Sequence, residues 1–166
     1  MNIELPEAEA LLSRLHEALR PIVGADFALV GIHTGGSWIA QRLRNLLALQ
    51  NPLGSLDIAF YRDDFVRTGL HAQVKPSAIP FDVEGRHIIL VDDVLYTGRT
   101  VRAAMNELFD YGRPASIQLV VMVDRGGREL PIEAQVVGCT VELPREVQVR
   151  LQRGGDGRLS LGIRHA

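Results

Sequence analysis

Two adjacent carboxylates, Asp92 and Asp93, close an apolar run in the stretch "LVDDVLYTGRT" (90–100), and the small-residue turn Thr97 to Thr100 follows them. An amphipathic helical pattern begins directly after this turn. A helix N-terminus offers unpaired N–H groups and partial positive charge, so the turn could bind a phosphate. The carboxylates just upstream could hold hydroxyl groups or Mg²⁺. Together these groups suit a phosphorylated ribose, whereas the simpler alternative is that the acids only cap the turn.

Other nucleotide-binding motifs fit the sequence poorly. The chain has no G-x-x-x-x-G-K-[ST] motif, and Gly31, Gly35 and Gly36 do not form G-x-G-x-x-G. A phosphoacceptor receiver domain also places an acidic pair after a strand, but it needs a later strand that ends in Lys. No lysine follows Lys75, so this alternative is disfavoured.

Composition bounds the class of protein. The 166 residues carry a net charge of -2, with seventeen arginines and the single lysine Lys75, so any nucleic-acid binding must come from a local patch. One cysteine, Cys139, excludes an internal disulfide framework, and the histidines lack metal-ligand spacing. The N-terminus has no apolar signal region and no run is long enough to span a membrane. We expect one soluble cytoplasmic domain, residues 1–166, with no membrane partner.

Hydrophobic periodicity predicts strands that alternate with helices. Helices are expected at 5–22, 34–50 and 98–112, and strands at 27–33, 55–61, 86–94 and 116–124, with short strands after residue 134 that form a small accessory layer. The third helix should bury Val101, Met105, Leu108 and Phe109. The all-apolar strands predict a parallel sheet covered on both faces, and ligands bind such sheets beyond the carboxyl ends of the strands. The acidic pair lies at that end. Residues 62–86 are expected to form a long loop.

The motif "VDDVLYTGRT" resembles the 5-phosphoribosyl 1-diphosphate (PRPP) binding motif of type I phosphoribosyltransferases. The longer run 89–132 is similar to the PyrR family, whose members regulate the pyrimidine operon and act as uracil phosphoribosyltransferases. The segments "LVGIHTGG" (29–36) and "FYRDDF" (60–65) match that family in the same order. The similarity extends from about residue 10 to 140. It implies an α/β fold of the type I phosphoribosyltransferase class: a central, mostly parallel twisted sheet flanked by helices, with a small hood and a flexible loop.

The resemblance assigns roles to residues of four segments. Asp92 and Asp93 would hold the ribose 2′- and 3′-hydroxyls, directly or through the Mg²⁺ that accompanies PRPP. The PRPP-binding residues would be Asp92, Asp93, Val94, Leu95, Tyr96, Thr97, Gly98, Arg99 and Thr100. The diphosphate loop would be His33, Thr34, Gly35 and Gly36, and the flexible loop would include Arg62, Asp63 and Asp64. The pyrimidine would be recognised by Val123, Asp124 and Arg125, largely through backbone groups of the hood segment 123–130.

The implied partners are PRPP, uracil, UMP or UTP, and the leader RNA of a pyrimidine operon, and the implied assembly is a homodimer or homotetramer. Relatives carry basic residues in the diphosphate loop where this chain has His33 and Gly35, so we expect a weak enzyme whose turnover Gly35→Arg would raise. RNA contact is expected from Arg14, Arg20 and Arg128. Arg125 and Arg128 could instead serve the base pocket or pair with Glu129 and Glu133. Two alternatives stay open: a sensor of PRPP and nucleotides with little catalysis, and a phosphoribosyltransferase for a purine.

Overall fold

The computed structural model describes residues 3–58 and 77–165, which form one parallel sheet with helices on both faces. The main sheet has the strand order β2-β1-β3-β4-β5, and every neighbouring pair is parallel. Its strands are β1 (Phe27–Ile32), β2 (Leu53–Leu56), β3 (His87–Leu95), β4 (Ser116–Asp124) and β5 (Val136–Thr140). The expected α/β architecture is therefore confirmed. None of the helices in the described ranges has the length and apolar character needed to cross a membrane.

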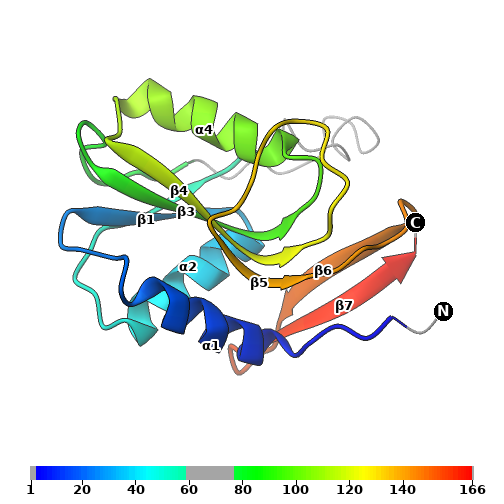
Figure 1. Cartoon of the computed structure of the whole chain (residues 1–166). Coiled ribbons are helices and arrows are strands. Elements are labelled where there is room, and N and C mark those ends of the chain that lie inside the picture. Colours follow the sequence, from blue (N-terminus) through cyan, green and yellow to red (C-terminus); the bar gives the residue numbers. More distant parts are fainter. Residues whose placement is uncertain (1–2, 59–76, 166) are drawn as a thin grey trace.

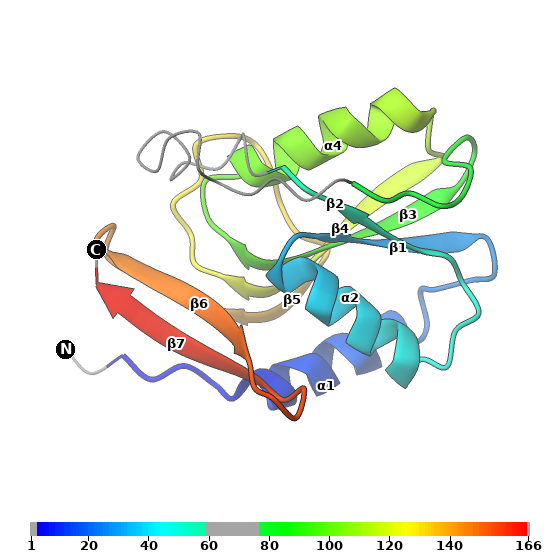
Figure 2. The same cartoon turned by 180° about the vertical axis from the view of Figure 1, so that it is seen from behind.

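The helices cover the two faces of the sheet unequally. Helix α4 (Arg99–Tyr111) lies on one face, and α1 (Ala8–Leu19) and α2 (Gly35–Leu46) lie on the other, as Figures 1 and 2 show from opposite sides. The continuous apolar runs of β1, β3 and β4 are buried because both of their faces are covered. A smaller antiparallel sheet, β6 (Val147–Arg153) and β7 (Leu159–His165), forms the accessory layer expected from the sequence.

Two details of the fold differ from the sequence prediction. The strand expected at 55–61 is observed as β2 at Leu53–Leu56, and residues 59–61 of that prediction lie outside the described part. Phe109, expected to face inward, is 56% exposed. The buried face of α4 is already filled by Val101, Ala104 and Leu108, spaced three and four residues apart, and Phe109 lies one residue beyond that stripe.

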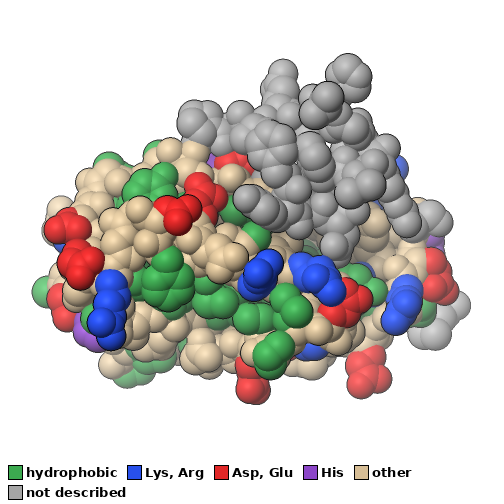
Figure 3. All heavy atoms as spheres, turned by 90° about the horizontal axis from the view of Figure 1, so that it is seen from above, with side chains coloured by type: hydrophobic (Ala, Val, Ile, Leu, Met, Phe, Trp, Pro, Cys, Tyr) green, Lys and Arg blue, Asp and Glu red, His purple; other side chains and the backbone are tan. Residues whose placement is uncertain are grey.

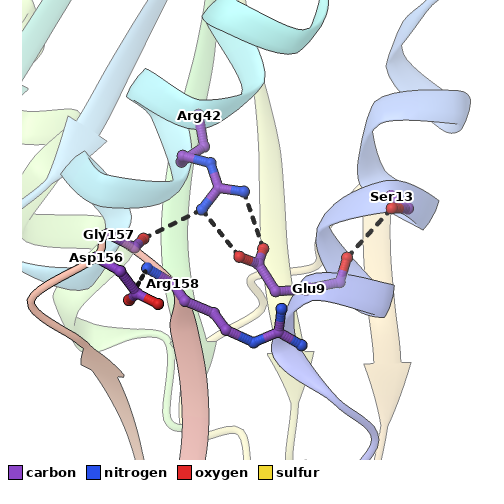
Figure 4. A network of polar contacts seen from close by, with 6 residues as sticks. All are labelled: Glu9, Ser13, Arg42, Asp156, Gly157 and Arg158. Atoms are coloured by element: carbon purple, nitrogen blue, oxygen red, sulfur yellow. Dashed lines mark hydrogen bonds and ion pairs between the residues drawn. The ribbon is translucent and has the colours of Figure 1, made fainter.

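A polar contact joins three elements on the α1 side of the sheet. The guanidinium of Arg42 on α2 donates to both carboxylate oxygens of Glu9 on α1, at 3.1 and 3.0 Å, and to the carbonyl of Gly157 in the β6–β7 turn at 3.3 Å. Figure 4 shows Arg42 between α1 and this turn. A bidentate arginine fixes orientation as well as distance, so this side chain holds the accessory layer against the two helices.

We expect Arg42→Ala to lower the free energy of unfolding by about 1–2 kcal/mol, because charged hydrogen bonds are lost at a partly exposed site. The measurement is urea unfolding at low and high salt. Arg102→Ala, which removes an exposed arginine of α4, is the matched control and should change the midpoint little. Equal effects of the two substitutions would contradict the structural role of Arg42.

Candidate active site

The loops that follow β1, β3 and β4 meet at one edge of the main sheet. These three strands are adjacent and parallel, so their carboxyl ends lie side by side. The loop after β1 leads into α2, the turn after β3 leads into α4, and the hood segment follows β4. In open parallel sheets this edge is where ligands bind.

The acidic pair, Asp92 and Asp93, lies within the last four residues of β3. Asp92 is buried, at 3% exposure, and Asp93 is half-buried. The N–H of Asp93 donates to the Asp92 carboxylate at 2.9 Å, and the N–H of Val94 donates to the Asp93 carboxylate at 2.8 Å. The alternation of faces also breaks here, because Val91 and Val94 both pack on the α1 and α2 side while Leu95 packs on the α4 side. The strand therefore ends irregularly where the carboxylates are held.

The two glycines that begin α2 lie against this strand end. A Cβ at Gly35 would come within 2.3 Å of a carboxylate oxygen of Asp93. A Cβ at Gly36 would come within 2.3 Å of the Val91 carbonyl and 3.0 Å of the Asp92 Cα. A side chain at Gly36 would strike the backbone of β3, and a side chain at Gly35 would require the Asp93 side chain to move. The loop 33–36, to which the resemblance assigns diphosphate binding, is thus in direct contact with the acidic pair.

The other two residues of the loop 33–36 are His33 and Thr34, and neither is an arginine or a lysine. The peptide between His33 and Thr34 is cis, Thr34 is exposed, and His33 Nδ1 lies 3.4 Å from the Ser37 hydroxyl. An arginine at position 35 would have to displace Asp93 before its guanidinium could reach an anion. We therefore replace the expectation that Gly35→Arg raises turnover with the opposite one. Among residues 34–36, the groups that could bind an anion are the backbone N–H groups and the Thr34 hydroxyl.

We expect Gly35→Ala to weaken binding of MgPRPP by roughly tenfold or more, because the added methyl moves the Asp93 carboxylate and charged interactions contribute about 1.5–3 kcal/mol each. Titration calorimetry measures the affinity, and thermal unfolding monitored by circular dichroism checks the fold. Gly155→Ala is the matched control, since a Cβ there meets nothing within 4 Å. Unchanged affinity of Gly35→Ala for MgPRPP would contradict a role of the contact between Gly35 and Asp93 in binding.

The turn after β3 has the form of a phosphate site. Gly98 has a φ of 93°, a left-handed conformation that glycine adopts without strain, and α4 begins at the next residue. The N–H groups of the first helical turn lack partners within the helix. The Thr97 hydroxyl accepts from the N–H of Arg99 at 3.2 Å, and the Arg99 side chain donates to Glu129 at 2.9 Å. Arg99 is thus held by an acid of the hood, a pairing that the sequence analysis did not predict.

Arg125, predicted to recognise the base, is 5% exposed, and its side chain forms contacts within the protein. Its guanidinium donates to the backbone carbonyls of Val147 and, at 2.9 Å, Pro144. The same group stacks over the ring of Tyr96 at 4.0 Å. Arg125 therefore joins the PRPP motif, the hood and the start of β6. Its backbone N–H donates to the Leu95 carbonyl at 3.0 Å, and Val123 lies in β4 between paired residues of β3 and β5, so these backbone groups are used within the fold.

Asp124 and Arg128 stabilise the hood. Arg128 donates to the Asp124 carboxylate at 2.6 Å, to the Tyr96 carbonyl at 3.0 Å and to the Ile132 carbonyl at 2.8 Å. Burial raises the pKa of Asp124, but the hydrogen bonds from Arg128 and from the N–H of Gly126, with the arginine's charge, outweigh burial and hold that pKa below its ordinary value. Of the three roles weighed for Arg128, the structure favours pairing with an acid, though with Asp124 and not with a glutamate.

The lowered pKa of Asp124 predicts a pH dependence of stability. The ionised carboxylate is favoured in the folded state, so its contribution is present above about pH 4 and is lost as the pH falls through the lowered folded value. We expect Asp124→Asn to be less stable than the parent protein at pH 7, and the difference to shrink below about pH 4. Urea unfolding at several pH values measures this, with Asp110→Asn, at an exposed carboxylate of α4, as the control for net charge. A difference in the free energy of unfolding that stays constant with pH would contradict the lowered pKa of Asp124 in the folded protein.

Other predicted residues lie apart from this edge or outside the described ranges. Arg14 and Arg20 are exposed on α1; Arg14 donates to the Gly138 carbonyl at 3.4 Å, and Arg20 lies 3.6 Å from Glu17. The flexible-loop residues Arg62, Asp63 and Asp64 lie outside the described part.

The chemistry of the donors fits a Mg²⁺ that arrives with a diphosphate. Within residues 3–58 and 77–165 no cluster of three or more acidic, histidine or cysteine side chains could hold a metal ion. Asp92 and Asp93 supply only two carboxylates, and the oxygen preference of Mg²⁺ is commonly met by one or two carboxylates, substrate phosphates and water. A resident metal site built from protein ligands alone does not fit these residues.

The comparison with protein families agrees with this geometry. Residues 3–152 match the model of the phosphoribosyl transferase domain, which defines the class of protein. Proteins named "Bifunctional protein PyrR" are 54% identical over 155 residues in Pseudomonas paraeruginosa, covering 90% of each chain, and 64% identical over 126 residues in Nitrosococcus oceani, covering 75% of this chain and 71% of the other. The chain therefore belongs to the PyrR family of phosphoribosyl transferases.

Solved structures support the same fold at lower identity. A hypoxanthine-guanine phosphoribosyltransferase from Bacillus anthracis is 18% identical with a TM-score of 0.66, covering 89% of this chain and 88% of the other. A hypoxanthine phosphoribosyltransferase from Staphylococcus aureus is 21% identical with a TM-score of 0.63, covering 87% and 80%. At this identity the likeness establishes the type I phosphoribosyltransferase fold and does not identify the base.

Proposed function

We propose that the chain transfers the 5-phosphoribosyl group of PRPP to uracil, giving UMP and diphosphate, and that it regulates expression of pyrimidine-biosynthesis genes in response to pyrimidine nucleotides. The observation that carries the enzymatic part is the contact between the diphosphate loop and the acidic pair. It gathers groups suited to a ribose, a phosphate and a diphosphate at one edge of the sheet. The PyrR name of the relatives supports the regulatory part.

The reaction breaks the bond between ribose C1 and the diphosphate and forms a bond from C1 to N1 of uracil, which loses a proton. The transition state has oxocarbenium character, so catalysis requires a held ribose, a neutralised leaving group and little water. In this proposal Asp92 and Asp93 hold the ribose hydroxyls, Thr97 to Thr100 bind the 5′-phosphate, and backbone groups of the loop 33–36 orient the diphosphate. Mg²⁺, when bound with PRPP, would offset the charge of the leaving diphosphate.

The hood provides the proposed base site. The side chains of Arg125 and Arg128 donate to the carbonyls of Pro144 and Tyr96 and hold this segment in position. The flexible loop 62–64, proposed to close over PRPP, lies outside the described residues. Exclusion of water by such a loop would suit the chemistry.

A second candidate is a sensor of PRPP and nucleotides with little catalysis. The specific observation in its favour is the loop 34–36, which has no cationic side chain and no room for one beside Asp93. The deciding experiment measures UMP formation from uracil and PRPP, with hypoxanthine and guanine as competing bases. Turnover with uracil alone supports the enzyme, PRPP binding without turnover supports the sensor, and turnover with a purine would overturn the pyrimidine assignment.

Asp93→Asn should abolish Mg²⁺-dependent PRPP binding while the fold is retained, because Asp93 is only half-buried and its loss leaves no buried charge unpaired. Calorimetry with MgPRPP measures the affinity, and the thermal midpoint checks the fold. Asp110→Asn again controls for the change in net charge. If Asp93→Asn binds MgPRPP as the parent protein does, the ribose role of the acidic pair is rejected.

We also propose a homodimer or homotetramer. Figure 3 looks onto the face that carries α4, where hydrophobic side chains lie between arginines and carboxylates. Phe109 is 56% and Tyr111 44% exposed there. Exposed aromatic side chains of this kind favour an interface between protein surfaces. Sedimentation of the purified chain measures the assembly.

A further inference from the structure

The hood lies directly against the turn that is proposed to bind the 5′-phosphate. The N–H groups of Glu129 and Leu130 both donate to the Thr97 carbonyl, at 2.9 and 3.2 Å. A Cβ at Gly98 would come within 3.0 Å of the Ile132 side chain, so the two segments are in close contact there as well. These contacts fix the backbone of Glu129 beside the start of α4.

The Glu129 side chain forms an ion pair with Arg99, the first residue of α4. The Nε–H of Arg99 donates to a Glu129 carboxylate oxygen at 2.9 Å, and the two side chains are 52% and 47% exposed. An exposed ion pair contributes little to the stability of a fold. Its position is more informative, because a helix N-terminus attracts anions through its unpaired N–H groups and partial positive charge. The carboxylate thus supplies at this turn the same kind of charge that a ligand phosphate would supply.

The hood contains a second ion pair that differs in burial and geometry. Arg128 donates to Asp124 at 2.6 Å, with side chains that are 23% and 17% exposed, and it also donates to two backbone carbonyls. Breaking that pair would leave partly buried groups unsatisfied. The pair of Arg99 and Glu129 is longer and more exposed, so water can solvate both side chains when they separate. Of these two ion pairs, the exposed one can exchange partners at the lower cost.

A phosphate monoester would compete strongly with the carboxylate for Arg99. At pH 7 it carries a charge of about −1.5 to −2 and three strong acceptor oxygens, whereas a carboxylate carries a single charge. A guanidinium also matches phosphate oxygens in a bidentate manner. Two anions beside the same turn repel each other, so a bound phosphate would favour movement of the Glu129 carboxylate away from Arg99.

We propose that Glu129 is a specificity-determining residue that competes with the 5′-phosphate of the ligand for Arg99. Before a ligand binds, the Glu129 carboxylate neutralises Arg99; when a phosphorylated ribose binds, the phosphate takes its place and the carboxylate moves into solvent. The competition lowers the affinity of the turn for any phosphate, so a ligand is held only when its ribose and base are bound as well. The inference rests on the proposed function, because it deepens the assignment of residues 97–100 to the 5′-phosphate.

The test compares UMP, which carries the 5′-phosphate, with uridine, which lacks it, by titration calorimetry on the full chain. The ratio of the two dissociation constants isolates the contribution of the phosphate. We expect Glu129→Gln to raise the preference for UMP over uridine about two- to fivefold at low salt, the size of an exposed ion-pair effect. The gain should shrink at high salt, where charges are screened over a shorter distance. Thermal unfolding monitored by circular dichroism checks the fold.

A double-mutant cycle separates competition for Arg99 from simple repulsion of the phosphate. Arg99→Gln should lower the preference for UMP, because it removes the cation for which the two anions compete. Glu129→Gln added to Arg99→Gln should then have little further effect. If Glu129→Gln raises the preference equally with and without Arg99, the carboxylate acts by repulsion alone and the proposed exchange is wrong. If Glu129→Gln lowers the preference, Glu129 orients Arg99 toward the phosphate and the competition is rejected.

The matched control is Glu133→Gln, which removes another exposed carboxylate close by in the chain and should leave the preference for UMP near that of the parent protein. A parent protein that binds UMP no more tightly than uridine would overturn the 5′-phosphate assignment and, with it, this inference. A parent protein that prefers UMP to the same extent as Glu129→Gln does would overturn the inference alone.

Discussion

The close approach of the β1–α2 turn to the end of β3 is the constraint on which the site depends. Two consecutive glycines allow it, because a Cβ at Gly35 would strike the Asp93 carboxylate and a Cβ at Gly36 would strike the backbone of Val91 and Asp92. The turn and the strand end are therefore positioned by direct contact and not through intervening side chains. A loop that wraps an anion with backbone N–H groups needs this absence of side chains. In this chain a basic residue at position 35 would require the Asp93 side chain to move, so the uncharged loop and the position of Asp93 are matched to each other.

Periodicity and turn residues were sufficient to predict most of the fold. The buried strands and amphipathic helices occupy nearly the ranges that the hydrophobic pattern predicts, and α4 ends before Gly112 as expected. The errors arose where local pattern competes with tertiary packing. Phe109 fits the apolar stripe of α4 by type, but smaller residues already complete the buried face, so the ring lies in solvent. Pattern alone does not tell how wide a face the sheet will cover.

The site could be predicted only in part, and the reason is again physical. Motifs that bind through local backbone, such as the turn at Gly98, are visible in a short stretch of sequence. Side-chain roles that depend on distant partners are not. Arg125 belongs to the predicted base site, yet its guanidinium bonds to carbonyls about twenty residues further along the chain. No spacing rule connects these positions, because the contact exists only after β6 has folded against the hood.

The arginines of this chain differ in whether their guanidinium groups are bonded within the protein or exposed to solvent. Arg42, Arg125 and Arg128 each donate several hydrogen bonds to partners within the protein, and moving them to a ligand would leave buried carbonyls or carboxylates unsatisfied, at a cost of about 1–3 kcal/mol each. Arg150 and Arg164 are exposed instead, and the Arg150 guanidinium donates to the neighbouring Gln148 side chain at 3.3 Å. Because Arg125 stacks on Tyr96 and donates to the Val147 carbonyl at the start of β6, a single buried side chain joins the predicted PRPP-binding segment to the β6–β7 hairpin.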